Sequence, residues 1–159
     1  AEIGVYKGNS AKVLAALKGR RRLFLFDTFS GFDERDIAGR DSKHRKLFTD
    51  TSLDAVRSFV GSAGVEYVQG WFPDSTTEAA KSATYALVHI DCDLYAPARA
   101  ALEFFYPRMS PGGIFLIHDY GTGTWPALAE AVDTFFSTKP ERPIMLPDAC
   151  CSAIIRKSA

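Results

Sequence analysis

The chain has 159 residues, of which 47% are hydrophobic and 24% are charged, and this composition is typical of one globular domain with its own core. Basic and acidic residues number 19 each, so the formal net charge is zero, which argues against a nucleic-acid-binding surface. No apolar stretch is long enough to span a bilayer, so we expect no membrane partner.

Apolar runs alternate with helical patterns along the chain. Five short runs without polar alternation are predicted strands, as expected where a sheet is covered on both faces. These strands are residues 1–5, 23–27, 65–69, 85–91 and 113–119. Helices are predicted where apolar residues recur at helical spacing. These helices are residues 10–19, 96–107 and 124–136. The alternation predicts right-handed βαβ units with helices on both faces of a parallel sheet.

The end of the chain departs from this pattern. The apolar runs 142–147 and 150–157 are separated by a short turn around Pro147 and Asp148, which leaves no room for a crossover helix. These two strands must therefore be antiparallel. We expect one α/β, Rossmann-like domain over residues 1–159, with a mostly parallel sheet that ends in an antiparallel hairpin. Residues 31–50 are charged and without periodicity, and a connection of that length is expected to be mobile or functional.

The three cysteines do not form a recognisable framework. Cys150 and Cys151 are adjacent, and no CxxC spacing is present. We therefore expect reduced thiols in a cytoplasmic protein.

Glycines follow the first predicted strand. Gly4 and Gly8 allow a tight turn before a helix that Ser10 can cap, but the spacing is neither that of a P-loop nor of a complete GxGxxG motif. Asp27 ends the second strand, where an acid can accept both ribose hydroxyls. Glu2 suits an ammonium group. Ribose and ammonium without phosphate indicate S-adenosylmethionine, although a plain strand–helix turn stays possible.

The fourth and fifth strands end in charged side chains. Asp91 and Asp93 follow one strand, and His118 and Asp119 follow the next. Because neighbouring parallel strands lie about 4.8 Å apart, these groups can converge, and they would repel one another without a cation. We expect Asp91 and Asp119 to bind Mg²⁺ or another divalent ion, with His118 as a third ligand or a catalytic base. Helix capping by the aspartates, and an ordinary hydrogen-bonded His118, are the structural alternatives.

Five segments resemble the macrocin O-methyltransferase family in order and spacing. They are EIGVYKGNSAK, FDTFSGF, VQGWFPDS, HIDCDLYAP and PGGIFLIHDYG. The resemblance implies the class I methyltransferase fold, with seven strands of which the last is antiparallel. It also implies S-adenosylmethionine-dependent methylation of sugar hydroxyls in macrolide and aminocoumarin antibiotics.

The resemblance assigns roles to residues of this chain. It makes Asp91 and Asp119 metal ligands and Asp93 the general base. The residues expected at the cofactor are Glu2, Gly4, Gly8, Ser10, Asp27, Thr28, Phe29, Ser30, Gln69, Gly70, Trp71 and Asp91. His118 departs from the aspartate of characterised family members, which puts the identity of the metal in question. Family members also carry a leading segment before the cofactor turn, so we expect a trimmed chain or a minimal form with a more open site.

The expected activity is metal-assisted O-methylation of a sugar or glycosylated small molecule, and the protein is a possible homo-oligomer. Two alternatives stay open. One is a catechol- or phenol-type O-methyltransferase of the same fold. The other is a truncated, non-catalytic core that binds the cofactor.

Overall fold

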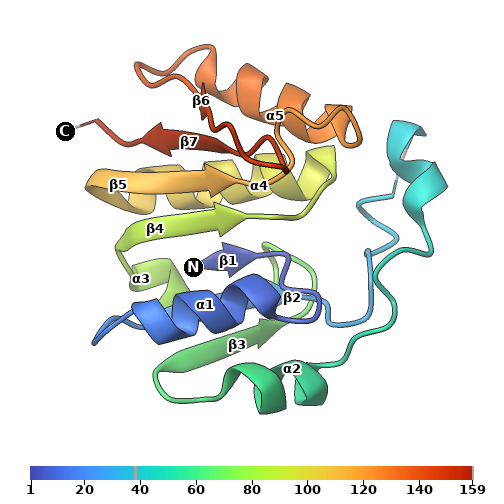
Figure 1. Cartoon of the computed structure of the whole chain (residues 1–159), viewed down its shortest axis with the longest axis vertical. Helices are drawn as coiled ribbons and strands as arrows, with labels where there is room; N and C mark the ends of the chain where they lie inside the picture. The colour runs from blue at the N-terminus through green and yellow to red at the C-terminus, as the bar shows by residue number, and fades with distance from the viewer. Residues whose placement is uncertain (38, 159) are drawn as a thin grey trace. The chain divides into compact units, whose positions relative to one another are not determined.

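The computed structural model describes residues 1–37 and 39–158, and the chain divides into two compact units, Ala1–Lys81 and Ser82–Ala159. Each unit is an α/β arrangement of its own strands and helices (Figure 1). Among the described residues, no helix combines the length and the apolarity that crossing a membrane requires. The expectation of a single domain stays a prediction.

The first unit contains three parallel strands in the order β3-β2-β1. The strands are β1 (Glu2–Ile3), β2 (Leu23–Asp27) and β3 (Val65–Gln69). The helices are α1 (Asn9–Leu17), the 3-10 helix η1 (Gly39–His44), α2 (Leu53–Val60) and α3 (Glu78–Ser82). Helix α1 packs against β2, and α2 packs against β3. Apolar side chains from these elements form a buried core, which comprises Val5, Ala11, Leu23, Leu25, Phe29, Val56 and Val60.

The second unit contains four strands in the order β4-β5-β7-β6. They are β4 (Tyr85–Ile90), β5 (Met109–Ile117), β6 (Ile144–Met145) and β7 (Ala153–Arg156). The helical elements are α4 (Tyr95–Phe105), η2 (Tyr106–Arg108) and α5 (Pro126–Phe136). Strands β4 and β5 are parallel, whereas β7 is antiparallel to both β5 and β6. The predicted mostly parallel sheet with a closing antiparallel hairpin is confirmed.

Among the described residues, α2, α3 and the 3-10 helix η1 are present beyond the predicted helices. Ser52 caps α2, because its hydroxyl accepts a hydrogen bond from the amide of Ala55 at 3.3 Å. Strand β6 is shorter than the predicted run 142–147, and Pro143 and Pro147 of that run lack the N–H that a ladder needs. Residues 31–50 include η1, and Ala38 lies outside the described residues. The mobility of this connection stays a prediction.

Gly8 is required by its backbone conformation and by its neighbours. It precedes α1 with a φ of 84°. A Cβ at this position would lie 2.8 Å from Cγ2 of Val60 and 3.0 Å from Cγ1 of Val56. A larger residue therefore meets both left-handed strain and the face of α2.

We expect Gly8→Ala to lower the free energy of unfolding by about 2–4 kcal/mol, because strain and overpacking add. Gly19→Ala is the matched control. Gly19 also has a positive φ, 59°, but no atom of the described residues outside its own chain neighbours lies within 4 Å of its ideal Cβ. Its expected loss is about 1 kcal/mol, from strain alone. Urea unfolding of both variants measures the difference, and equal losses would show that the contact with α2 contributes nothing.

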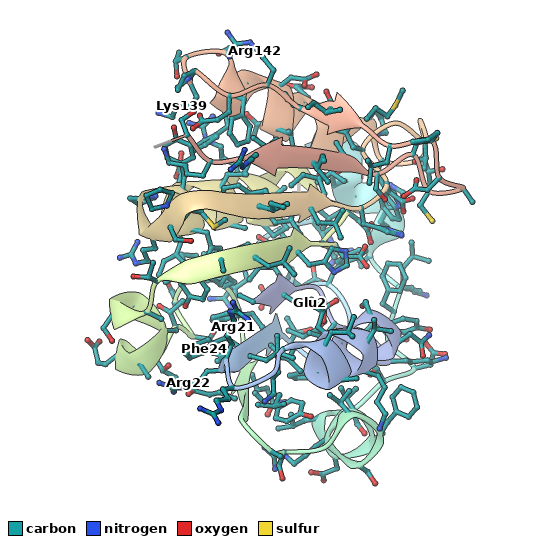
Figure 2. The ribbon with its side chains drawn as sticks, turned by 60° about the vertical axis from the view of Figure 1, so that its left-hand side comes forward. Glu2, Arg21, Arg22, Phe24, Lys139 and Arg142 are labelled. Atoms are coloured by element: carbon teal, nitrogen blue, oxygen red, sulfur yellow. The ribbon has the colours of Figure 1, made fainter. Side chains whose placement is uncertain are left out.

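The carboxylate of Glu141 is held by three donors in the second unit. Oε2 accepts from the hydroxyl of Tyr106 at 2.9 Å, and Oε1 accepts from the amide of Ser158 at 2.8 Å. The ammonium of Lys157 lies 3.3 Å from Oε1, and the Glu141 side chain is only 2% exposed. Burial alone would raise the pKa of Glu141, but these donors outweigh it and lower the pKa to about 2. Figure 2 shows Lys139 and Arg142 in the adjoining loop after α5, where Arg142 donates to the carbonyls of Phe136 and Lys139.

We expect Glu141→Gln to remove a pH-dependent part of the stability. A lowered folded-state pKa stabilises the protein above the unfolded pKa of about 4.3, and this stabilisation is lost as pH falls toward 2. The parent should exceed the variant by roughly 2 kcal/mol at pH 7, with the difference shrinking toward zero near pH 2. Urea unfolding across this range provides the measurement, with the exposed Glu103→Gln as control. A difference that does not change with pH would contradict this account.

Candidate active site

Asp27 organises the turn that follows β1. Its Oδ2 accepts hydrogen bonds from the amides of Val5 at 2.6 Å and Tyr6 at 3.0 Å. Its Oδ1 accepts from the amide of Phe29 at 2.6 Å. A carboxylate with three backbone donors fixes both the turn after β1 and the loop after β2. The ribose-binding role of Asp27 stays a prediction, and it would use the acceptor capacity that remains.

Glu2 and Ser10 contact one another within the first unit. Glu2 is fully buried on β1, and Figure 2 places it between β1 and α1. The hydroxyl of Ser10 donates to Oε1 of Glu2 at 2.5 Å. The expectation that Ser10 caps the helix is wrong, because the cap position belongs to Gly8 and Ser10 lies inside α1. The pair provides a buried acidic group beside the glycine turn.

The ends of β2 and β3 lie together. The amide of Gly70 donates to the carbonyl of Asp27 at 3.0 Å, and the side-chain amide of Gln69 donates to the carbonyl of Thr28 at 3.4 Å. Phe29 has a positive φ of 55°, and its ring is buried in the core of the first unit. Its ring is therefore a packing group, and a cofactor could contact Phe29 only through its backbone.

The connection 31–50 is fastened to these residues at two points. The indole Nε1 of Trp71 donates to Oδ1 of Asp36 at 3.0 Å. At the other end, Asp50 accepts from the hydroxyl of Tyr6 at 2.6 Å and from the ammonium of Lys7 at 2.5 Å. Trp71, which is expected at the cofactor, and Tyr6 thus hold this connection in place, and residues 31–50 are called the anchored loop.

In the second unit, Asp93 occupies a tight turn directly after β4. The amide of Leu94 donates to the carbonyl of Cys92 at 2.6 Å, which closes a γ-turn with Asp93 at its centre and a φ of 63°. Only 6% of Asp93 is exposed. Burial, together with the charges of Asp91 and Asp119, raises the pKa of Asp93 to about 8. Strained conformations of this kind are concentrated at functional sites.

His118 lies between two carboxylates. Its Nδ1 is 3.0 Å from Oδ1 of Asp91 and 3.4 Å from Oδ2 of Asp119, although neither contact has the angle of a directed hydrogen bond. The contact with Asp91 raises the pKa of His118 to about 10 despite partial burial. Asp119 follows β5 with a positive φ of 55°. The strand ends therefore do converge, as expected for neighbouring parallel strands.

A third residue joins this group from the hairpin. One donor atom each of His118, Asp119 and Cys150 lies within 4.8 Å of the other two. Asp91 contacts His118 but does not belong to this set of mutually close donors. The first unit thus has a glycine turn with the buried Glu2 and the half-buried Asp27. The second unit has the buried Asp93 and a cluster of nitrogen, oxygen and sulfur donors.

A model of the family described as macrocin-O-methyltransferase (TylF) matches residues 1–153. The chain belongs to the macrocin O-methyltransferase family. It is 32% identical over 139 residues to the 8-demethyl-8-(2,3-dimethoxy-alpha-L-rhamnosyl)-tetracenomycin-C 4'-O-methyltransferase of Streptomyces olivaceus, which covers 75% of this chain and 51% of that protein. It is 30% identical over 152 residues to the mycinamicin III 3''-O-methyltransferase of Micromonospora griseorubida, with 84% of this chain and 58% of that protein covered. The chain thus spans a little over half the length of these relatives.

Solved structures support the fold of this macrocin O-methyltransferase family member. The O-methyltransferase NovP superposes with a TM-score of 0.82 at 25% identity, covering 99% of this chain and 71% of that chain. The calicheamicin methyltransferase CalS11 gives a TM-score of 0.70 at 23% identity, over 98% of this chain and 70% of that chain. The class I methyltransferase fold is therefore established.

Cys150 is the residue of the donor cluster that the sequence did not predict. The sequence predicts an ordinary reduced thiol at Cys150, since the adjacent cysteines form no recognisable framework and no CxxC spacing is present. The antiparallel hairpin that closes the sheet is the feature from which the position of Cys150 could have been predicted. Because β7 pairs with β5 antiparallel, with Ile117 opposite Ala153, the residues before β7 return to the end of β5. Any donor in the turn around 148–151 therefore lies near residues 118–121.

Proposed function

We propose that the chain carries the cofactor-binding and catalytic residues of an S-adenosylmethionine-dependent O-methyltransferase that acts on a hydroxyl of a sugar or glycosylated small molecule. The observation that carries this proposal is the buried Asp93, held in a γ-turn beside Asp91 and Asp119. The sugar O-methyltransferases named among the relatives support the acceptor class. A cytoplasmic location and a homo-oligomeric state remain predictions.

The first unit suits a cofactor with ribose and ammonium groups. Gly4 and Gly8 adopt positive φ angles of 82° and 84°, which let the chain turn tightly between β1 and α1. Glu2 offers a buried acidic group, and Asp27 keeps the amides of the turn in place. When bound, S-adenosylmethionine would supply the methyl group, activated by its sulfonium. These residues bind and orient it.

The acceptor needs a base, because an alcohol holds its proton at neutral pH. Asp93 takes this proton as the oxygen forms its bond to the methyl carbon and the carbon–sulfur bond breaks. A positioned base of this kind contributes about 10²–10⁴-fold, and correct alignment of the two reactants contributes further. His118 is assigned a positioning role, since its Nδ1 faces Asp91 and Asp119. Asp93 is therefore the general base of the proposed reaction.

Metal assistance by Mg²⁺ receives little support from the donor set. Mg²⁺ prefers oxygen ligands in octahedral geometry, whereas the close set here contains one imidazole, one carboxylate and one thiol. No step of the proposed reaction is routed through Mg²⁺.

Calorimetric titration with S-adenosylmethionine, followed by acceptor profiling, tests the proposal. We expect saturable cofactor binding and methylation of glycosides in preference to catechols. Preference for catechols would indicate the phenol-type alternative. Cofactor binding without turnover on either class would indicate the non-catalytic core, and absence of cofactor binding would overturn the proposal altogether.

A further inference from the structure

The three close donors of the second unit come from two places that the fold holds side by side. His118 and Asp119 follow β5, and Cys150 lies in the turn between β6 and β7. The amide of Gly121 donates to the carbonyl of Cys151 at 2.9 Å, which ties the two segments together directly beside the donors. Inside the hairpin turn, the amide of Ser152 donates to Oδ1 of Asp148 at 2.8 Å. The backbone that carries the donors is thus fixed without any ion.

The spacing of the donors matches ligands of one small ion. With bonds of about 2.0–2.3 Å, two ligand atoms of Zn²⁺ are separated by at most roughly 4.6 Å. The three donor atoms here all lie within 4.8 Å of one another, so small side-chain rotations are sufficient to bring them onto one ion. All three residues are partly exposed, so an ion can enter from solvent.

The chemistry of the donors selects the metal. Imidazole and thiolate are ligands for Zn²⁺ and similar borderline ions, whereas Mg²⁺ takes carboxylate, carbonyl and water oxygens. We propose that His118, Asp119 and Cys150 form a binding site for a borderline divalent metal such as Zn²⁺, which they bind in preference to Mg²⁺. Three protein ligands leave a fourth tetrahedral position for water or an acceptor oxygen.

Asp91 is not one of the three close donors, but it contacts one of them, His118. Its Oδ1 lies 3.0 Å from Nδ1 of His118. A carboxylate this close to a ring nitrogen of a histidine fixes the orientation of the ring. Asp91 is therefore assigned a supporting role here, in place of the direct ligation that was predicted for it.

Titration of the metal-stripped, reduced chain with ZnCl₂ and with MgCl₂ separately, followed by calorimetry, tests this site. We expect Zn²⁺ to bind at least about 100-fold more tightly than Mg²⁺. Cys150→Ser should weaken Zn²⁺ binding by about 100-fold or more and leave Mg²⁺ binding unchanged. Cys151→Ser is the matched control, since it removes the neighbouring thiol that is absent from the donor set, and it should bind Zn²⁺ like the parent.

Substitution with Co²⁺ gives a second readout that does not depend on activity. The parent and Cys151→Ser should show a thiolate-to-cobalt charge-transfer absorption, and Cys150→Ser should lack it. Equal affinity for the two metals, or an equal loss in both cysteine variants, would overturn the inference. Because the site belongs to the proposed enzyme but the readout is metal binding, failure here leaves the cofactor titration and the proposed methyl transfer intact.

Discussion

Replacement of Asp93 by asparagine should reduce kcat by about 10²–10⁴-fold and leave the affinity for S-adenosylmethionine nearly unchanged. The amide has almost the same shape as the carboxylate but cannot take a proton from an alcohol. Asparagine also tolerates positive φ angles, so the γ-turn with its φ of 63° should persist. The measurement is kcat from product formation with the acceptor that profiling identifies, together with calorimetry of cofactor binding.

Asp54→Asn is the control for this variant. Asp54 is an exposed aspartate in the first turn of α2, and the same chemical change there should leave turnover unaltered. A general base contributes at least about 100-fold to the rate. If Asp93→Asn retains more than about a tenth of the parent's turnover, Asp93 is not the general base. The proton would then have to go elsewhere, and His118 would be the next group to test.

Asp27→Ala should have the largest effect on stability. Its carboxylate accepts from the amides of Val5, Tyr6 and Phe29, and removing it leaves three backbone donors without this partner. At about 1–3 kcal/mol for each unsatisfied donor, and allowing for water that reaches the site, we expect a loss of roughly 3–5 kcal/mol in the free energy of unfolding. Cofactor affinity should fall together with stability, because the turn loses its shape.

Asp27→Asn separates these two effects. The amide keeps one acceptor oxygen and presents an NH₂ group to the remaining donors. We therefore expect a free energy of unfolding between that of the parent and that of the alanine variant. Urea unfolding gives the stability, and calorimetry gives the cofactor affinity. A loss below about 1 kcal/mol in Asp27→Ala would show that water replaces the carboxylate without cost, and the structural role would then be wrong.

The parts of the fold that depend on local pattern could be read from the sequence. Strands β2 and β4 end within a residue of their predicted limits, because their apolar runs are short and end abruptly at acidic residues. The antiparallel hairpin followed from the lack of space for a crossover. Helix α2 was missed because it has only eight residues and is defined mainly by its Ser52 cap and its packing, not by a long repeat.

The site could be predicted only as far as strand adjacency reaches. Asp91 and His118 follow neighbouring parallel strands, so their proximity needs nothing beyond the order of β4 and β5. Cys150 depends on the register of β7 against β5, which no local pattern specifies. In the same way, only the structure shows that the ring of Phe29 is buried in the core of the first unit.

The anchored loop has a consequence for engineering acceptor choice. It is fixed by the Asp36–Trp71 and Asp50–Tyr6 hydrogen bonds, and between them Ile37 and Asp41 are buried, whereas residues 45–47 are exposed. Substitutions at the exposed residues 45–47 are expected to leave both hydrogen bonds in place, because surface positions of a loop tolerate change. In the proposed enzyme, these exposed positions are therefore where side chains can be exchanged while the turn after β1 keeps its hydrogen bonds.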